Sequence, residues 1–220
     1  MSTQGVYSNR GDYYQKLIAF KWAIKVLRNP EYEWLEIDSI KYPLVDDVVI
    51  QRQDGILICC QCKKNQTNHS NWTFNDLKDE LKKAFILLSE RDDTLVIFYS
   101  RTSFGKLSKI REYSEGQADE ISFLSNLPEE YSNIYKQLNS LAKEIKPDLS
   151  IYYLIKKITF SVTDDYQYLE EKLKEELQNT INNSHNVFNE MFFLIERTSS
   201  RIQRTDSFTD NLNSAPIFNM

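Results

Sequence analysis

The stretch that decides the fold runs from residue 45 to residue 63 and reads VDDVVIQRQDGILICCQCK. A run of β-branched residues favours a strand from Asp47 to Gln51, and a nearly continuous apolar run favours another from Ile56 to Lys63. The short polar segment between them, Gln53-Asp54-Gly55, is of the Asp-Gly type that closes tight turns. The stretch therefore predicts an antiparallel β-hairpin.

This hairpin is expected to bring three kinds of polar side chain together. Pairing of its two strands places Asp47 beside Gln61. Because successive side chains of a strand point to opposite faces, Gln61 and Lys63 share one face, while Cys60 and Cys62 share the other. An acid, an amide and an ammonium group are thus predicted to meet at one end of adjacent strands.

Such a group of side chains has a known chemical use. Magnesium prefers oxygen ligands, which the Asp47 carboxylate, the Gln61 amide and the backbone carbonyl of Cys62 would supply. Lys63 would polarise a metal-bound water or stabilise negative charge on a phosphate. The hairpin therefore predicts phosphodiester hydrolysis, although Asp46 and Asp47 would also suit the mere start of a strand after a turn.

The segments around the hairpin predict an α/β fold with a mixed central sheet flanked by helices. Apolar residues at helical spacing predict two helices, Tyr13–Leu27 and Asn75–Ser89. Short apolar runs predict two strands, Trp34–Ile40 and Thr94–Ser100. The run Thr94–Ser100 has the composition of a strand that is buried on both faces.

The remainder of the chain is predicted to be mostly helical. Within it, we expect a strand at Ile151–Val162, a helix from about Tyr166 and another over Asn186–Ser199. The whole is predicted to be one domain over residues 1–205, with a core at 10–100, a helical half at 101–205 and a loose tail at 206–220.

Composition limits the class of function. The 220 residues include 27 Lys and Arg against 32 Asp and Glu, a net charge of −5, which argues against a passive nucleic-acid binder. No apolar run is long enough for a transmembrane helix, so no membrane partner is expected. Three cysteines between Cys59 and Cys62 suit core packing better than zinc, and they suggest a reducing, cytoplasmic environment.

The motif Asp47…Gln61-Cys62-Lys63 resembles that of the PD-(D/E)XK nucleases in their D…QXK form, which have a restriction-endonuclease-like core. More narrowly, the chain is similar to the endonuclease domain of SAVED-fused effectors in cyclic-oligonucleotide (CBASS) antiphage systems. Similar domains occur in antiviral STAND ATPases and as Lamassu effector subunits. Supporting segments are Gly11–Gln15 at the first helix and Trp72-Thr73 before the next.

The resemblance implies a role for each matching residue. Asp47 would be the main ligand of Mg²⁺ or Mn²⁺, Lys63 the catalytic lysine, and Gln15 would orient water, metal or phosphate. Gln61 stands where many relatives carry Glu or Asp, which removes a negative charge from the site. Two further acids are candidate supporting groups: Asp46, on the opposite face from Asp47, and Glu36 from the first strand.

The resemblance also implies a function, a metal-dependent DNA endonuclease that serves as effector of a prokaryotic antiphage system. Its partners would be double-stranded DNA, further copies of itself in a dimer or tetramer, and sensor subunits such as an SMC-like or STAND-type protein. The alternatives are a catalytically degenerate interaction subunit and an RNA-cleaving variant. The chain would be either a stand-alone effector or a fragment of a longer one.

A basic patch is the last candidate site. Lys106, Lys109 and Arg111 stand close enough in sequence to contact phosphates of DNA together. Basic residues on a helix are equally often a solvated face, and the sequence leaves both interpretations open.

Overall fold

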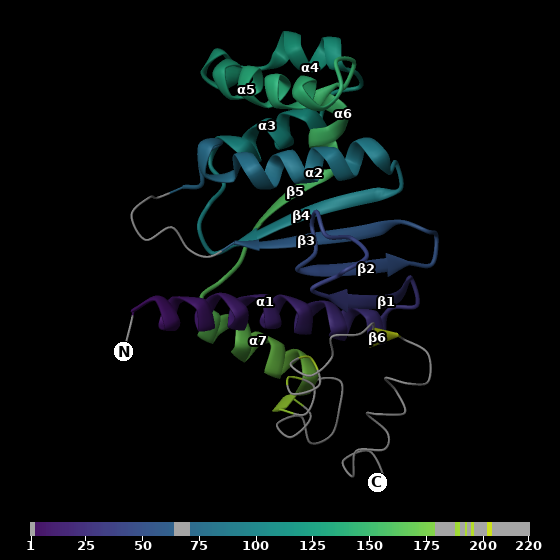
Figure 1. Cartoon of the computed structure of the whole chain (residues 1–220), viewed down its shortest axis with the longest axis vertical. Coiled ribbons are helices and arrows are strands. Elements are labelled where there is room, and N and C mark those ends of the chain that lie inside the picture. Colours follow the sequence, from purple (N-terminus) through teal and green to yellow (C-terminus); the bar gives the residue numbers. More distant parts are fainter. Residues whose placement is uncertain are drawn as a thin grey trace.

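The computed structural model describes residues 3–63 and 71–178, together with residues 188, 189, 192, 195, 202 and 203. Figure 1 shows a central sheet with helices on both faces, and on one side further helices stack outside the first layer. The strands are β1 (Tyr32–Ile37), β2 (Val48–Arg52), β3 (Leu57–Lys63), β4 (Thr94–Ser100), β5 (Ile158–Val162) and β6 (Ile202–Gln203). The α/β class with a mixed central sheet is thereby confirmed.

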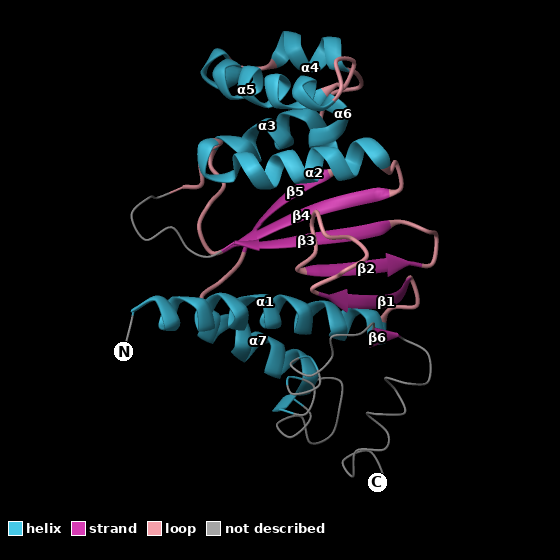
Figure 2. Cartoon of the chain, viewed as in Figure 1, coloured by secondary structure: helices cyan, strands magenta, loops and turns pink. Residues whose placement is uncertain are grey.

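Seven helices surround this sheet in the described part of the chain (Figure 2). They are α1 (Thr3–Arg28), α2 (Lys78–Glu90), α3 (Lys106–Glu115), α4 (Glu120–Asn126), α5 (Glu129–Ile145), α6 (Ile151–Lys156) and α7 (Tyr166–Gln178). A 3-10 turn at Asn75–Leu77 leads into α2, where the sequence predicted the start of a helix. None of these helices is long and apolar enough to cross a membrane.

The strand order is β5-β4-β3-β2-β1-β6, and the direction of pairing changes at β3. β2 and β3 form the predicted antiparallel hairpin, in which Val48 pairs with Cys60 and Val49 with Cys59. From β3 outward the pairing is parallel, first to β4 and then to β5. The carboxyl ends of these three strands consequently lie at one edge of the sheet, where ligands of α/β proteins commonly bind.

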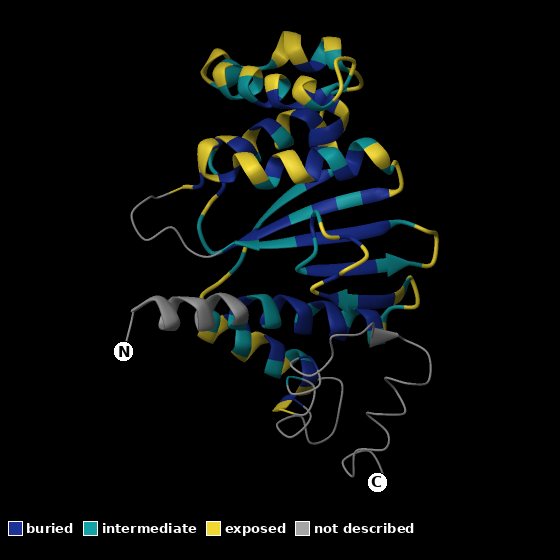
Figure 3. Ribbon diagram, in the orientation of Figure 1, coloured by how far each residue is buried: buried dark blue, intermediate teal, exposed yellow. Residues whose placement is uncertain are grey.

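Each face of the sheet has its own apolar core, as the burial in Figure 3 indicates. Cys59 and Phe98 face the core beneath α2, α3 and α5, whereas Ile58 and Cys60 face the core beneath α1 and α7. The predicted alternation along β3 is therefore present. Cys59 and Cys60 are buried without a disulfide, and burial raises the pKa of both thiols, as expected of core-packing residues.

The predicted strand Ile151–Val162 is wrong in its first half. That half forms α6, whose Tyr152, Leu154 and Ile155 are buried, and only Ile158–Val162 forms a strand. A short run of β-branched and aromatic residues suits a buried helix as well as a strand, so packing decides between them. Most of the predicted helix Asn186–Ser199 and all of the tail 206–220 lie outside the described residues.

Candidate functional site

The end of the β2–β3 hairpin holds a polar cluster around Asp47. Gln61 Nε2 donates a hydrogen bond to Asp47 Oδ2 at 2.6 Å, and the backbone N–H of Cys62 donates to the same oxygen at 2.5 Å. Asp47 sits just before β2, and Gln61 lies in β3, so the hairpin register produces this contact. The structure thus brings together three of the residues that the sequence selected.

Gln15 joins this cluster from the first helix, as predicted from the sequence. Its Nε2 donates to Asp38 Oδ1 at 2.6 Å and to the backbone oxygen of Asp47 at 3.1 Å. Asp38 has a φ of 50°, a left-handed conformation that Asp adopts more readily than most residues other than glycine. Glu36, the acid that the sequence selected, pairs with Val49 farther along the sheet. Asp38 is therefore a cluster member that sequence reasoning missed.

Lys63 is held by a carboxylate that the sequence did not single out. Its Nζ forms an ion pair with Glu80 of α2, and both side chains are largely buried, at 17% and 24% exposure. Asp46 accepts the backbone N–H of Ser39 through its carbonyl oxygen at 3.0 Å. Burial raises the pKa of Asp46. We name Gln15, Asp38, Asp47, Gln61, Lys63 and Glu80 the Asp47 cluster.

The carboxyl of Asp47 is unusually basic. Burial raises its pKa to about 6, and the neighbouring acids Asp46 and Asp38 add to this effect. The Cys62 N–H and the Lys63 ammonium act in the opposite direction without cancelling it. Asp47 therefore changes its protonation state within the mildly acidic pH range.

The predicted magnesium site requires several oxygen ligands, and hydrogen bonds engage the side chains that would supply them. Asp47 Oδ2 already accepts two hydrogen bonds, and Gln61 presents its amide N–H rather than its oxygen to Asp47. Among the described residues, no group of three or more His, Cys, Asp or Glu side chains is arranged to hold a metal ion. Bound Mg²⁺ stays a prediction from the sequence, and we derive no step through it.

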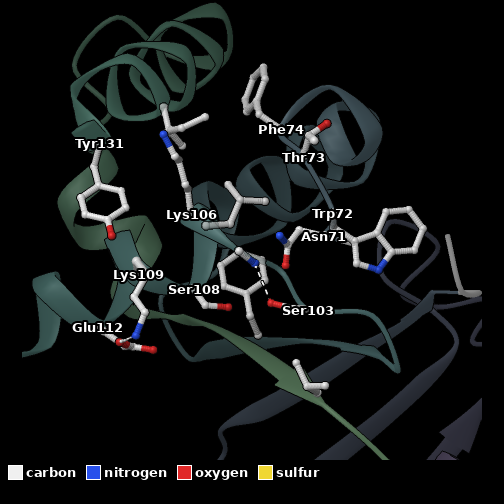
Figure 4. Close-up of a pocket in the computed structure, with 15 residues that line it drawn as sticks. Asn71, Trp72, Thr73, Phe74, Ser103, Lys106, Ser108, Lys109, Glu112 and Tyr131 are labelled. Carbon is white, nitrogen blue, oxygen red and sulfur yellow. Dashed lines mark hydrogen bonds and ion pairs between the residues drawn. The ribbon is translucent and has the colours of Figure 1, made fainter. Parts of the chain in front are cut away.

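A pocket of about 670 Å³ lies near the carboxyl ends of β4 and β5 (Figure 4). Its wall combines amide, hydroxyl, cationic and aromatic side chains from four segments of the chain. The lining residues are Asn71, Trp72, Thr73, Phe74, Ser103, Gly105, Lys106, Leu107, Ser108, Lys109, Glu112, Tyr131, Ile134, Phe160 and Val162. We call it the α3 pocket, because the first turns of α3 form much of its wall.

The approach to α3 is shaped by one glycine. Gly105 has a φ of 50°, and a Cβ atom there would lie 3.2 Å from the Cβ of Asn71. A larger residue at this position would be strained and would push against Asn71. Gly105 also provides no capping side chain, so the N-terminal end of α3, which attracts anions, borders the pocket.

The predicted basic patch divides between two places. Lys106 and Lys109 line the α3 pocket, because residues three apart share one face of a helix. Arg111 does not join them. Its Nε donates to the backbone oxygen of Ile158 at 2.9 Å, and its guanidinium pairs with Glu115.

Trp72 connects the α3 pocket with β4, the strand that pairs with the Lys63 end of β3. Its indole N–H donates to Ser100 Oγ at 2.7 Å, and Ser100 is the register partner of Lys63 in the β3–β4 pair. Both Trp72 and Ser100 are buried. The pocket and the Asp47 cluster thus share one edge of the sheet.

We expect Trp72→Phe to lower the free energy of unfolding, because it removes a buried hydrogen bond. The bond itself contributes about 1 kcal/mol. Urea denaturation of wild type, Trp72→Phe, Ser100→Ala and the double variant would isolate it, because the cycle subtracts the packing change caused by the smaller ring. Additive effects of the two substitutions would show that the bond contributes nothing.

Comparisons with known proteins give a likeness of fold alone. No protein-family model and no curated protein matches the chain. The chain resembles solved structures of the Acinetobacter baumannii Cap4 SAVED/CARF-domain containing receptor. The structure without ligand gives a TM-score of 0.61 at 15% sequence identity. The structure with the cyclic trinucleotide 3'3'3'-cAAA gives a TM-score of 0.61 at 16% identity, and the one with 2'3'3'-cAAA gives 0.56 at 13% identity. Each match covers 92% of this chain but only 44–46% of the receptor, so the chain spans less than half of the receptor's length.

These structures correct the assignment made from the sequence. The sequence was compared with nucleases that are fused to SAVED domains, and the solved structures also contain a SAVED domain. These structures, however, are described as receptors and not as nucleases. The assignment to the PD-(D/E)XK nucleases, and the DNA endonuclease function drawn from it, are therefore not retained. The alternative of a degenerate interaction subunit gains no support from the comparison.

Proposed function

We propose that this chain is a module of a receptor for cyclic oligonucleotides in antiphage defence, and that the α3 pocket binds part of the ligand. The observation that carries the proposal is the pocket itself, in which two lysines and several aromatic residues surround about 670 Å³ at the carboxyl edge of parallel strands. The likeness to a receptor solved with cyclic trinucleotides supports the choice of ligand. The defence setting belongs to the proposal too, because SAVED domains, which the solved receptors contain, occur in the antiphage systems with which the sequence was compared.

The size and lining of the α3 pocket suit a nucleotide. Small-molecule sites usually occupy about 300–1,000 Å³ and combine apolar walls with a few polar groups that fix orientation. Here Phe74, Phe160 and Ile134 supply apolar wall, and Tyr131 supplies an aromatic face for a base. Burial and the nearby Glu130, with which the phenol forms a hydrogen bond, raise the pKa of Tyr131, which therefore remains neutral.

The cationic groups of the pocket suit the phosphodiesters of the ligand. Lys106 Nζ donates to the backbone oxygen of Glu130 at 3.2 Å, which holds the ammonium group near the first turn of α5. Lys109 stands one helical turn later on the same wall. Two ammonium groups beside the positive end of α3 are a favourable environment for phosphate oxygens.

Several finer predictions are separate from this proposal. The order of one helix, three strands, a second helix and a parallel strand supports a restriction-endonuclease-like core, which we keep as a proposal about the fold. Phosphodiester hydrolysis, bound Mg²⁺, double-stranded DNA, self-association and sensor subunits remain predictions from the sequence. The receptor function depends on none of them.

Fluorescence anisotropy with a labelled cyclic trinucleotide tests the proposal. We expect the purified chain to bind labelled 3'3'3'-cAAA saturably, and unlabelled ligand to displace it. Linear tri-adenylate is the matched competitor, because it has the same bases without the closed ring. A dissociation constant above about 1 mM for the cyclic ligand, equivalent to about −4 kcal/mol, would count against the proposal.

A further inference from the structure

The α3 pocket contains an acidic residue that a phosphate-binding site would not be expected to include. Of the described residues that line the pocket, Glu112 alone carries a carboxylate. Figure 4 shows its side chain beside Lys109, with Lys106 and Tyr131 in the same part of the wall. A carboxylate here repels the phosphates that the lysines attract, so its presence needs an explanation.

Glu112 is engaged with Lys109. The distance between Lys109 Nζ and Glu112 Oε2 is 2.7 Å, and the two residues stand three apart on α3. Glu112 raises the pKa of Lys109 through this hydrogen bond. The side chains are 55% and 54% exposed, and such pairs on exposed helix surfaces are weak. A ligand phosphate can therefore replace the carboxylate at Lys109 without a large loss.

We infer that Glu112 is an internal competitor for the phosphate of the ligand, and that it limits the affinity of the α3 pocket for anions. This inference rests on the proposed function. In the free protein Glu112 neutralises Lys109, and a bound phosphodiester takes its place. The displaced carboxylate remains on the same wall and repels the phosphate, so simple anions gain little from the pocket. A ligand that also contacts the aromatic wall compensates for this repulsion.

Glu115 provides a matched comparison on the same helix. It is exposed to a similar degree, at 54%, and it also pairs with a basic residue of α3, in this case Arg111. Glu115 is not among the residues that line the pocket. Substitution of either glutamate by glutamine removes one negative charge and one surface ion pair, but only Glu112 faces the proposed ligand.

The test is anisotropy with labelled 3'3'3'-cAAA on the full chain, for wild type, Glu112→Gln and Glu115→Gln. We expect Glu112→Gln to bind about threefold to tenfold more tightly at low salt, in line with one nearby charge removed at the protein surface. Glu115→Gln should bind as wild type does. The gain from Glu112→Gln should shrink when the salt concentration is raised to about 0.5 M, because salt screens the repulsion between exposed charges. A change of helix packing would not give this salt dependence.

Each outcome has a distinct meaning. If wild type binds and the two variants bind equally well, the inference is overturned and the proposed function stands. If wild type binds, and Glu112→Gln binds more tightly than both wild type and Glu115→Gln, the inference is supported. If neither wild type nor Glu112→Gln binds, both the inference and the proposed function are overturned. Glu112→Ala serves as a second variant, and circular dichroism confirms that each protein is folded.

Discussion

Binding of 3'3'3'-cAAA should fall by on the order of 100-fold when Lys106 and Lys109 are both replaced by alanine. Each lysine is expected to make a charge-assisted hydrogen bond to a phosphate, and such a bond contributes about 1.5–3 kcal/mol. Since about 1.4 kcal/mol corresponds to a tenfold change in affinity, loss of both bonds gives at least this effect. Anisotropy titrations at constant ionic strength provide the measurement.

Lys143→Ala is the control for this experiment. Lys143 is exposed in the last turn of α5 and does not line the α3 pocket, so it changes net charge without touching the proposed site. The substitution should leave binding unchanged within about twofold, because distant surface charges are screened. Equal binding by wild type and the double variant would place the ligand site elsewhere.

The second large effect concerns the stability of the fold. The folded-state pKa of Asp47 is about 6, above its ordinary value of 3.8, chiefly because the carboxyl is buried. Between these two values the folded protein binds more protons than the unfolded chain, so this group lowers stability as the pH rises. Its contribution to the free energy of unfolding should be largest below pH 4 and fall by about 2–3 kcal/mol above pH 6.

Asp47→Asn should remove this dependence on pH. The amide oxygen of asparagine still accepts a hydrogen bond from Cys62 N–H, but the side chain carries no charge to bury. We expect urea denaturation between pH 4 and pH 8 to show a smaller loss of stability for the variant than for wild type. Asp148→Asn, in an exposed turn, is the control and should follow wild type. A variant with the wild-type pH profile would show that Asp47 does not titrate in this range.

Local sequence patterns were sufficient to predict the sheet up to β4. The hairpin of β2 and β3 follows from the Asp-Gly turn and the two apolar runs, and Thr94–Ser100 was predicted with the bounds that β4 has. These segments have strong β propensity and clear turn chemistry, so neighbours in sequence decide their structure. The segment Ile151–Val162 has similar residues, but α6 packs against other helices there, and tertiary contacts override the local pattern.

The Asp47 cluster was predictable only in part. Asp47 and Gln61 were found because the register of the hairpin places them side by side, and Gln15 was named from the family resemblance. Asp38 and Glu80 were missed because a residue with positive φ and a contact from α2 leave no periodic signal in the sequence. The motif was also assigned to the wrong class of protein, since a few common residue types at one spacing fit many proteins.

The α3 pocket left no pattern in the sequence at all. Its wall comes from the segments 71–74, 103–112, 131–134 and 160–162, which meet only when α3, α5 and β5 are packed. No single segment has the composition of a binding motif. The two lysines were noticed as a basic patch, but Arg111 was grouped with them because spacing in sequence does not reveal the edge of a sheet.

Arg111 lies at the β5 edge of the sheet, where its side chain contacts the backbone of the outermost strand. β5 is the outermost strand on its side of the sheet in the described structure, and an outer strand offers unpaired carbonyl groups to strands of other molecules. The guanidinium of Arg111 bonds the carbonyl of Ile158 in this strand and brings a fixed positive charge with it. Another chain that aligned along β5 would have to displace the Arg111 side chain and its ion pair with Glu115, and charged side chains at a sheet edge disfavour such pairing.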